Sequence, residues 1–426
     1  SGFTAVAGEG YFVDTSSGAV TANLPAGTAG AVVGFKDYLN SFDTHALTLD
    51  LNGSDKAGGS TDDPIISTEG MAVTLVFIDS TQGWLVTDSG LQSDATAPQY
   101  IAATGGNTTI TCGDNKIHIF TGPGTFCVSN VGNPVGNDTV EYLVVAGGGG
   151  GGGANSPGCG GRGGAGGGGF RVFSALSGTG SSPSCGGPGS SINAPAGITV
   201  TPGAMPVTVG AGGASGAAAT APSGHGARGA SSIFSTITST GGGGGSGYPS
   251  PSPSPTNPAS PGGSGGGAYF SCGMGTGNTP PVSPPQGNPA SAGHPGSGGA
   301  GVGGGGAGAS PFPMAVISPS HSGYGGGVGS NVPNSFIGPT ASSYGQSPSP
   351  LAPNGRYFSG GGGGGSYSDG TAGSGGAGGG GGGAKGSNAT DGTVNTGGGG
   401  GGTGAGPNIG GAGGSGIVMI RYKFQN

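Results

Sequence analysis

Residues that could carry chemistry are few in this 426-residue chain, and they are dispersed. Gly262–Gly266 satisfies the G-x-S-x-G pattern of a serine nucleophile, but in a glycine-rich segment the match arises by chance, and no strand-then-helix pattern surrounds it. Asp62-Asp63 indicates a solvated loop rather than a catalytic carboxylate pair. The histidines are expected at surface or turn positions rather than as bases: His45, His118, His225, His294 and His321. The sequence therefore predicts no enzyme and no cofactor.

The five cysteines do not suggest a metal site, because none forms a C-x-x-C pair and no histidine stands at zinc-ligand spacing from them. Two candidate disulfides remain. Cys112 and Cys127 flank the strand-like segments KIHIF and TFCVS and could face each other across a hairpin. Cys159 and Cys185 could clamp the first glycine-rich excursion, and Cys272 would then be left over.

Composition divides the chain near Glu141. Of the 114 glycines, 20 precede this residue, so 114 − 20 = 94 fall in the remaining 286 residues. Glycine thus makes up about one third of these residues, as it does in collagen, but the strict Gly-X-Y period of collagen is missing. Fifteen of the 17 acidic residues lie at or before Glu141. The net charge of −7 and the scattered basic residues argue against nucleic acid as a partner, and no 18-residue apolar stretch predicts membrane insertion.

The first 141 residues are expected to form β-structure. Val20, Ala22 and Leu24 alternate with polar residues, the period of a half-buried strand, and no 3.6-residue apolar stripe reaches three turns. Residues 1–92 are expected to form a small all-β module with Trp84 as a core anchor. A linker at 93–100 and a β connector at 101–141 should follow.

The remaining residues, 142–426, carry glycine runs that are bracketed by strand-like segments, from EYLVVA at the start to SGIVMIRYKF at the end. A disordered linker is not expected to end in a strand-like segment as apolar as SGIVMIRYKF. A polyglycine II helix makes no internal hydrogen bonds and rises about 3.1 Å per residue. Without Cβ atoms, such helices can pack side by side and bond each other's backbones. The predicted fold class is therefore all-β modules followed by a domain of packed polyglycine II helices, with essentially no α-helix.

These motifs also carry a family resemblance. EYLVVAGGGGGGG, VTVGAGG and GGAGGSGIVMIRYKF resemble the glycine-rich domain of bacteriophage tail-fibre proteins, and are similar in kind to the distal adhesins of T-even-like phages that infect Salmonella. VGFKDY, DLNGS and TLVFIDSTQGWLV resemble a β-module of phage fibre proteins, notably those of marine phages. CGDNKIHIFTGPGTFCVS resembles the connector before such domains. Together these segments cover nearly the whole chain, although the loops between glycine runs match nothing.

Aromatic residues in those loops are the candidate receptor contacts, because rigid aromatics among Ser, Gly, Asn and Pro are typical of recognition loops. The alternative is that they pack as lids on the glycine layers. The candidates are Tyr248, Phe312, Tyr324, Phe336, Tyr344, Tyr357 and Phe358, in loops 248–261, 278–295, 310–324 and 331–358.

The resemblance implies a virion tail-fibre adhesin, outside the cell. Its partners would be a bacterial surface receptor, polysaccharide or outer-membrane protein, and other tail-fibre subunits. The fibre modules imply a homotrimer, with a monomeric glycine tip as the alternative. Two other function classes stay open: an ice-binding protein, since polyglycine bundles also support flat Thr- or Ala-rich faces, and a purely architectural fibre protein.

Overall fold

The computed structural model describes residues 2–88, 97–156, 160–176, 191–218, 224–247, 259–269, 273–291, 299–311, 321–347, 355–367 and 369–426. These residues divide into two compact units. The N-terminal unit comprises residues 1–102, 130–138 and 423–426, and the glycine-rich unit comprises residues 103–129 and 139–422. The residues of the predicted connector, 101–141, are divided between the two units, and most of them belong to the glycine-rich unit.

Two four-stranded sheets form the N-terminal unit. One has the order β1 (Gly2–Thr4), β3 (Val20–Asn23), β5 (Leu47–Asp50) and β6 (Ile65–Ile66). The other has the order β2 (Gly10–Val13), β4 (Val32–Asp37), β7 (Ala72–Phe77) and β8 (Trp84–Val86). Alternate residues of both sheets join one buried cluster, and fully buried Trp84 lies in it, as predicted.

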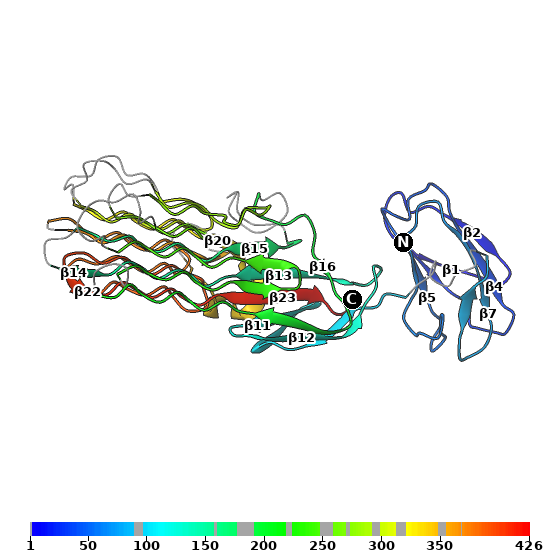
Figure 1. Ribbon diagram of the computed structural model, residues 1–426. Coiled ribbons are helices and arrows are strands. Elements are labelled where there is room, and N and C mark those ends of the chain that lie inside the picture. The colour runs from blue at the N-terminus through cyan, green and yellow to red at the C-terminus, as the bar shows by residue number, and fades with distance from the viewer. Residues whose placement is uncertain are drawn as a thin grey trace. The chain divides into compact units, whose positions relative to one another are not determined.

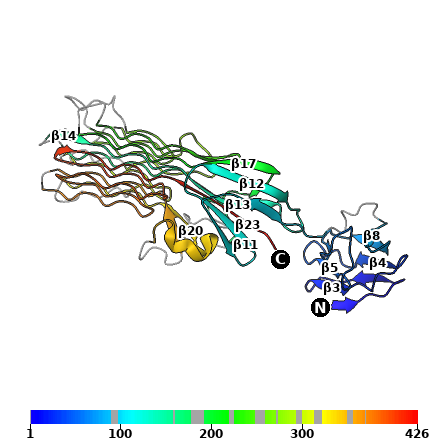
Figure 2. The same cartoon turned by 90° about the horizontal axis from the view of Figure 1, so that it is seen from below.

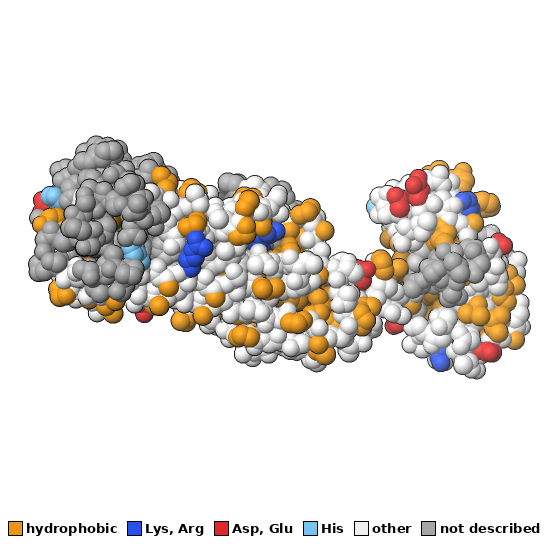
Figure 3. Space-filling model, viewed as in Figure 1, with side chains coloured by type: hydrophobic (Ala, Val, Ile, Leu, Met, Phe, Trp, Pro, Cys, Tyr) orange, Lys and Arg blue, Asp and Glu red, His pale blue; other side chains and the backbone are white. Residues whose placement is uncertain are grey.

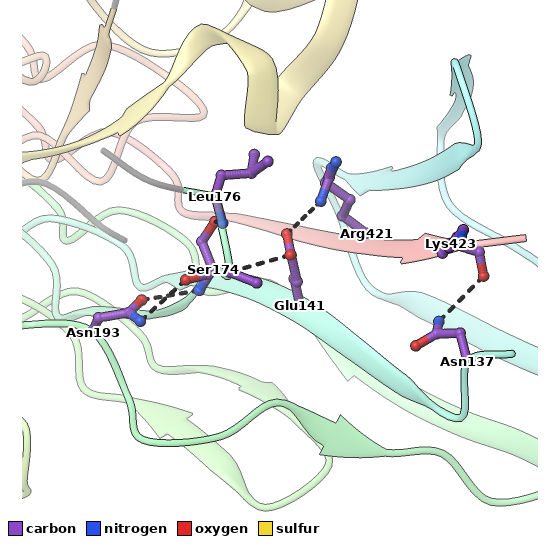
Figure 4. Close-up of polar contacts among 8 residues, drawn as sticks. Asn137, Glu141, Ser174, Leu176, Asn193, Arg421 and Lys423 are labelled. Atoms are coloured by element: carbon purple, nitrogen blue, oxygen red, sulfur yellow. Dashed lines mark hydrogen bonds and ion pairs between the residues drawn. The ribbon is translucent and has the colours of Figure 1, made fainter. Parts of the chain in front are cut away.

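A larger sheet lies at one end of the glycine-rich unit. Its order is β10 (Thr108–Cys112), β11 (Asn115–Phe120), β23 (Ile417–Lys423), β13 (Thr139–Val145) and β15 (Phe170–Phe173), and β16 (Ile198–Thr199) pairs with β13. The last strand of the chain, β23, thus lies between strands that precede the glycine runs. A half-buried ion pair joins two register partners of β13 and β23: Arg421 Nη1 donates to Glu141 Oε2 at 2.7 Å, as Figure 4 shows.

A second sheet of this unit has the order β19 (Ile237–Ser239), β18 (Ser232–Phe234), β17 (Gly203–Thr208), β12 (Gly124–Val131) and β9 (Ile101–Thr104). Two strand pairs complete the unit: β14 (Ala154–Ser156) with β22 (Gly406–Asn408), and β20 (Ser330–Pro333) with β21 (Gly355–Phe358). The short helix α1 (Asn334–Ile337) and the 3-10 turn η2 (Gly338–Ser343) are the helical elements among the described residues. The prediction of an all-β chain with a glycine-rich domain is confirmed.

Glycine runs lead from the sheet that contains β13 and β23 to the strand pair β14 and β22, as Figures 1 and 2 show. Run 147–153 connects β13 to β14, and run 409–416 connects β22 to β23. The bundle of runs therefore has two ends, which we call the β13–β23 end and the β14–β22 end.

Backbone hydrogen bonds hold the runs together. In run 147–153, the N–H groups donate to three neighbours in rotation, so that Gly147, Gly148 and Gly149 bond to Ala230, Gly414 and Gly166 at 2.9–3.0 Å. Three residues later, Gly150, Gly151 and Gly152 bond to the same three neighbouring runs. Three further runs donate to its carbonyl oxygens. A repeat of three residues and the lack of internal bonds are the properties of a polyglycine II helix.

The enclosed runs make a core that consists mostly of backbone, with few side chains such as those of Arg162 and Ala165. Six neighbouring runs surround 147–153, and the same holds for 160–169, 359–366 and 396–404. A Cβ atom built on Gly147 would meet the Ala211 backbone, and one on Gly150 would meet Ala214, again at a three-residue interval. Glycine is required here because the backbones approach too closely for any side chain.

Candidate functional site

Most of the candidate receptor-contact aromatics are buried, so they cannot contact a receptor in this conformation. The exposed fraction is 4% for Tyr324 and Tyr357 and 0% for Phe336 and Phe358. Tyr344 is half-buried, with its hydroxyl 3.5 Å from Thr108 Oγ1. Tyr248 and Phe312 lie outside the described residues. The assignment of recognition is therefore corrected for the four buried residues, and their packing supports the alternative of a structural role.

The position of segment 331–358 between glycine runs predicts a display loop, and the structure differs. In the structure it holds β20, α1, η2 and β21 at the β13–β23 end. Phe336 and Phe358 share a buried cluster with Ile117 of β11 and Met419 of β23. Their apolar surface stabilises the fold through burial, which is worth about 2–3 kcal/mol for a side chain of this size.

The predicted Cys112–Cys127 disulfide is absent, since both cysteines are free. Cys112 lies on β10, which pairs with β11, whereas Cys127 lies on β12, opposite Ala204 of β17. The two strands belong to different sheets, and this separates the thiols. Cys159, Cys185 and Cys272 lie outside the described residues.

Other residues considered for chemistry have structural roles. Ser264 is fully buried within a glycine run. Asp63 Oδ1 accepts the Leu51 N–H at 2.9 Å, and Asp62 Oδ2 accepts the Ser60 hydroxyl at 2.9 Å. Among the residues that the structure describes, no group of three His, Cys, Asp or Glu side chains could hold a metal ion. Within the same residues, no helix has the length and hydropathy to cross a membrane.

Polar and aromatic side chains gather instead at the β14–β22 end. His321 begins run 321–329, and Tyr367 and Asp369 lie in the turn between runs 359–366 and 370–377. Figure 3 shows histidine and acidic side chains side by side at this end of the glycine-rich unit. We call His321, Tyr367 and Asp369 the end cluster.

A hydrogen bond joins His321 to Asp369, with Nδ1 and Oδ1 2.6 Å apart. An ionised carboxylate only accepts, so the Nδ1 atom carries the proton and donates. This bond is the main cause that holds the pKa of Asp369 below its ordinary value, and the positive charge of Lys385 acts in the same direction. The His321 ring also packs edge-on against Tyr367, with centroids 5.7 Å apart. The carboxylate is therefore ionised and its side chain is held in place.

Two further polar side chains, those of Arg162 and His225, lie at the β14–β22 end and make contacts within the bundle. The Arg162 side chain is fully buried, with Nη1 donating to the Gly160 carbonyl at 2.8 Å and the guanidinium 5.1 Å from the Tyr269 ring centre. His225 Nδ1 accepts the Gly247 N–H at 3.0 Å, and burial lowers the pKa of this histidine. These contacts tie the ends of neighbouring runs together.

Comparison with known families matches residues 121–423 to a family model described as a glycine-rich domain. The chain belongs to the glycine-rich domain family. The matched region begins before β12 and ends with the last residue of β23, so this glycine-rich domain takes in all of the runs and leaves out the first 120 residues. No curated protein matches the chain.

The end cluster was not found from the sequence. His321 and Asp369 are 48 residues apart, and the sequence does not tell which runs are neighbours. One signal was present: Asp369 is one of only two acidic residues after Glu141, and it interrupts a glycine-rich stretch.

Proposed function

We propose that this chain is a bacteriophage tail-fibre adhesin that binds a bacterial surface receptor, either a polysaccharide or an outer-membrane protein. It is a virion component outside the cell. Other tail-fibre subunits are its assembly partners, and its N-terminal modules form a homotrimer. The proposal assigns no catalytic role and no cofactor to the chain.

One observation carries this proposal. In the enclosed runs, the space beside most glycines is filled by backbone, as at Gly147 and Gly150, so these positions leave no room for a side chain. Described residues at the ends of the runs are not enclosed in this way, and at the β14–β22 end they include Tyr269, His321 and Tyr367. A rigid scaffold with variable connections is the usual arrangement for recognition. Membership in the glycine-rich domain family and the order of the sequence motifs support the same assignment.

Binding of the full-length chain to bacteria tests the proposal. A fluorescently labelled chain is added to a panel of bacterial strains, and cell-bound fluorescence is measured. Saturable binding to some strains and not others is expected. A matched pair of variants places the contact: exchange of the turn 367–370 at the β14–β22 end should change the strains that are bound, whereas exchange of the β18–β19 turn, Ser235-Thr236, at the β13–β23 end should not. Absence of binding to every strain would contradict the proposal.

Ice binding is the second candidate, because one outer face of the bundle carries regularly spaced alanines. Ala211, Ala214 and Ala217 are exposed at every third position of one run, and Ala227 and Ala230 of the adjoining run are exposed beside them. The spacing within each line is about 9 Å, three residues of a polyglycine II helix. A thermal hysteresis assay distinguishes the two functions, and measurable hysteresis would favour this candidate. A purely architectural protein would show neither hysteresis nor cell binding.

A further inference from the structure

The end cluster is held by its own hydrogen bonds, independently of any ligand. The Tyr367 N–H donates to the His321 carbonyl at 3.2 Å, and the Gly370 N–H donates to the Tyr367 carbonyl at 3.1 Å. Beside them, the Thr371 N–H donates to Ser322 Oγ at 3.1 Å. The turn that carries Tyr367 and Asp369 is thus tied to the start of run 321–329. A preformed group of this kind loses little entropy on binding.

The cluster offers both hydrogen-bonding capacity and an aromatic ring. The Asp369 side chain is 63% exposed, and only its Oδ1 atom has a hydrogen bond to a described side chain, that of His321. An ionised carboxylate has about four acceptor positions, so several remain for a ligand. His321 is 28% exposed, and its Nδ1 atom is committed to Asp369, which leaves Nε2 as its other polar atom. Tyr367 is half-buried and adds a ring face and a hydroxyl.

We propose that His321, Tyr367 and Asp369 form a subsite for a neutral saccharide. The inference rests on the proposed function and names the chemical class of the receptor. Sugar hydroxyls donate to the Asp369 carboxylate, and the apolar face of a pyranose packs against the Tyr367 ring. His321 is a positioning residue that orients the carboxylate, and its Nε2 atom bonds to a further hydroxyl.

Local charge favours a neutral ligand over a charged one. An anionic ligand would be repelled by the Asp369 carboxylate, which is ionised at neutral pH. A cationic ligand would be attracted by that carboxylate but repelled by Lys385, whose positive charge also acts to lower the pKa of Asp369, so the two effects oppose each other. Hydroxyl groups both donate and accept hydrogen bonds, so a polyhydroxyl ligand matches the mixed donors and acceptors without a charge of its own.

The test compares the full-length chain with two aspartate variants. Asp369→Asn removes the charged acceptor. Asp391→Asn is the matched control, because Asp369 and Asp391 are the two acidic residues that follow Glu141. Asp391 lies outside the end cluster, and its Oδ1 atom accepts the Ala412 N–H. The probes are an array of bacterial surface polysaccharides and whole cells that were treated with periodate, which oxidises vicinal diols, or with protease.

The wild-type chain and Asp391→Asn should bind the same polysaccharides with the same affinity. The affinity of Asp369→Asn should be lower by about tenfold or more, the loss expected for a hydrogen bond to a charged group. Tyr367→Ala should weaken binding similarly, and periodate but not protease should abolish binding to cells. Equal binding by the two aspartate variants would overturn the subsite. Cell binding that is lost with protease and kept with periodate would also overturn it, while the adhesin proposal would stand. Failure of the wild-type chain to bind any cell would overturn both.

Discussion

Alanine substitution at two glycines of one run, Gly380 and Gly382, separates the effect of packing from that of glycine content. A Cβ atom on Gly380 would lie 2.8 Å from the Gly376 nitrogen and 2.9 Å from the Gly361 carbonyl carbon, and nearer still to the Gly361 oxygen. On Gly382, the nearest atom to an added Cβ is Thr390 Oγ1, at an ordinary contact distance of 3.5 Å. Neither glycine has a left-handed φ, so alanine fits the backbone conformation of both.

The expected cost follows from the contacts. An alanine at 380 pushes its run away from run 359–366, which lengthens the Gly363 N–Gly381 O and Gly360 N–Gly378 O bonds of 2.9 and 3.0 Å. Two hydrogen bonds at about 1 kcal/mol each, with overpacking of about 1–3 kcal/mol, give a loss of about 3–5 kcal/mol. Gly382→Ala should instead gain up to about 1 kcal/mol, because alanine restricts the unfolded chain.

Scanning calorimetry of the full-length variants measures this difference, and hydrogen exchange of peptides from residues 360–416 assigns the transition to the glycine-rich unit. The melting temperature of Gly380→Ala should be lower than that of Gly382→Ala by on the order of 10 °C. Equal melting temperatures would refute the reasoning, since they would show that the Gly380 site has no close backbone neighbours in solution.

Three other predictions follow from buried residues. Phe336→Ala should lower stability by about 3–5 kcal/mol in thermal melts, as expected for a core phenylalanine, while leaving cell binding of the folded protein unchanged; a loss of binding at unchanged stability would contradict its structural role. Arg421→Met should cost about 1–3 kcal/mol, because it removes the charged partner of the half-buried Glu141 carboxylate and leaves it only the Ala175 N–H, and adding Glu141→Met should restore much of the loss in denaturant titrations. Burial holds the pKa of His118 below its ordinary value of about 6.5, so as the pH falls this histidine is protonated in the unfolded chain before it is protonated in the folded chain. The free energy of unfolding should therefore decrease as the pH drops below about 6.5. Melting temperatures measured between pH 5 and 8 should show this decrease, and His118→Gln should make it smaller.

Local patterns in the sequence were sufficient to predict the fold class and the glycine-rich domain. The apolar segments EYLVVA and SGIVMIRYKF, which bracket the glycine runs, form strands β13 and β23, and the runs pack through their backbones as the absence of side chains implied. Trp84 is buried where the alternation of the first module placed a core. These features depend on residue type and on near neighbours, which a sequence shows directly.

What the sequence could not show depends on which distant segments are neighbours. Cys127 is placed by the pairing of β12 with β17, almost 80 residues away along the chain, so its proximity to Cys112 in sequence was misleading. Phe336 and Phe358 look like loop aromatics until β10 and β11 supply the surface that buries them. The contact of His321 with Asp369 likewise exists only because runs 321–329 and 359–366 are neighbours in the bundle.

Amide hydrogen exchange in run 147–153 of the full-length protein tests the central claim, a rigid core held together by backbone hydrogen bonds. All seven of these N–H groups have backbone acceptors in neighbouring runs, at 2.8–3.0 Å, and all seven residues are buried. We expect them to exchange only through global unfolding of the glycine-rich unit, as slowly as the amides of β13 and β23. Exchange at the rate of an unstructured peptide would contradict the claim and would remove the scaffold on which the proposed function depends.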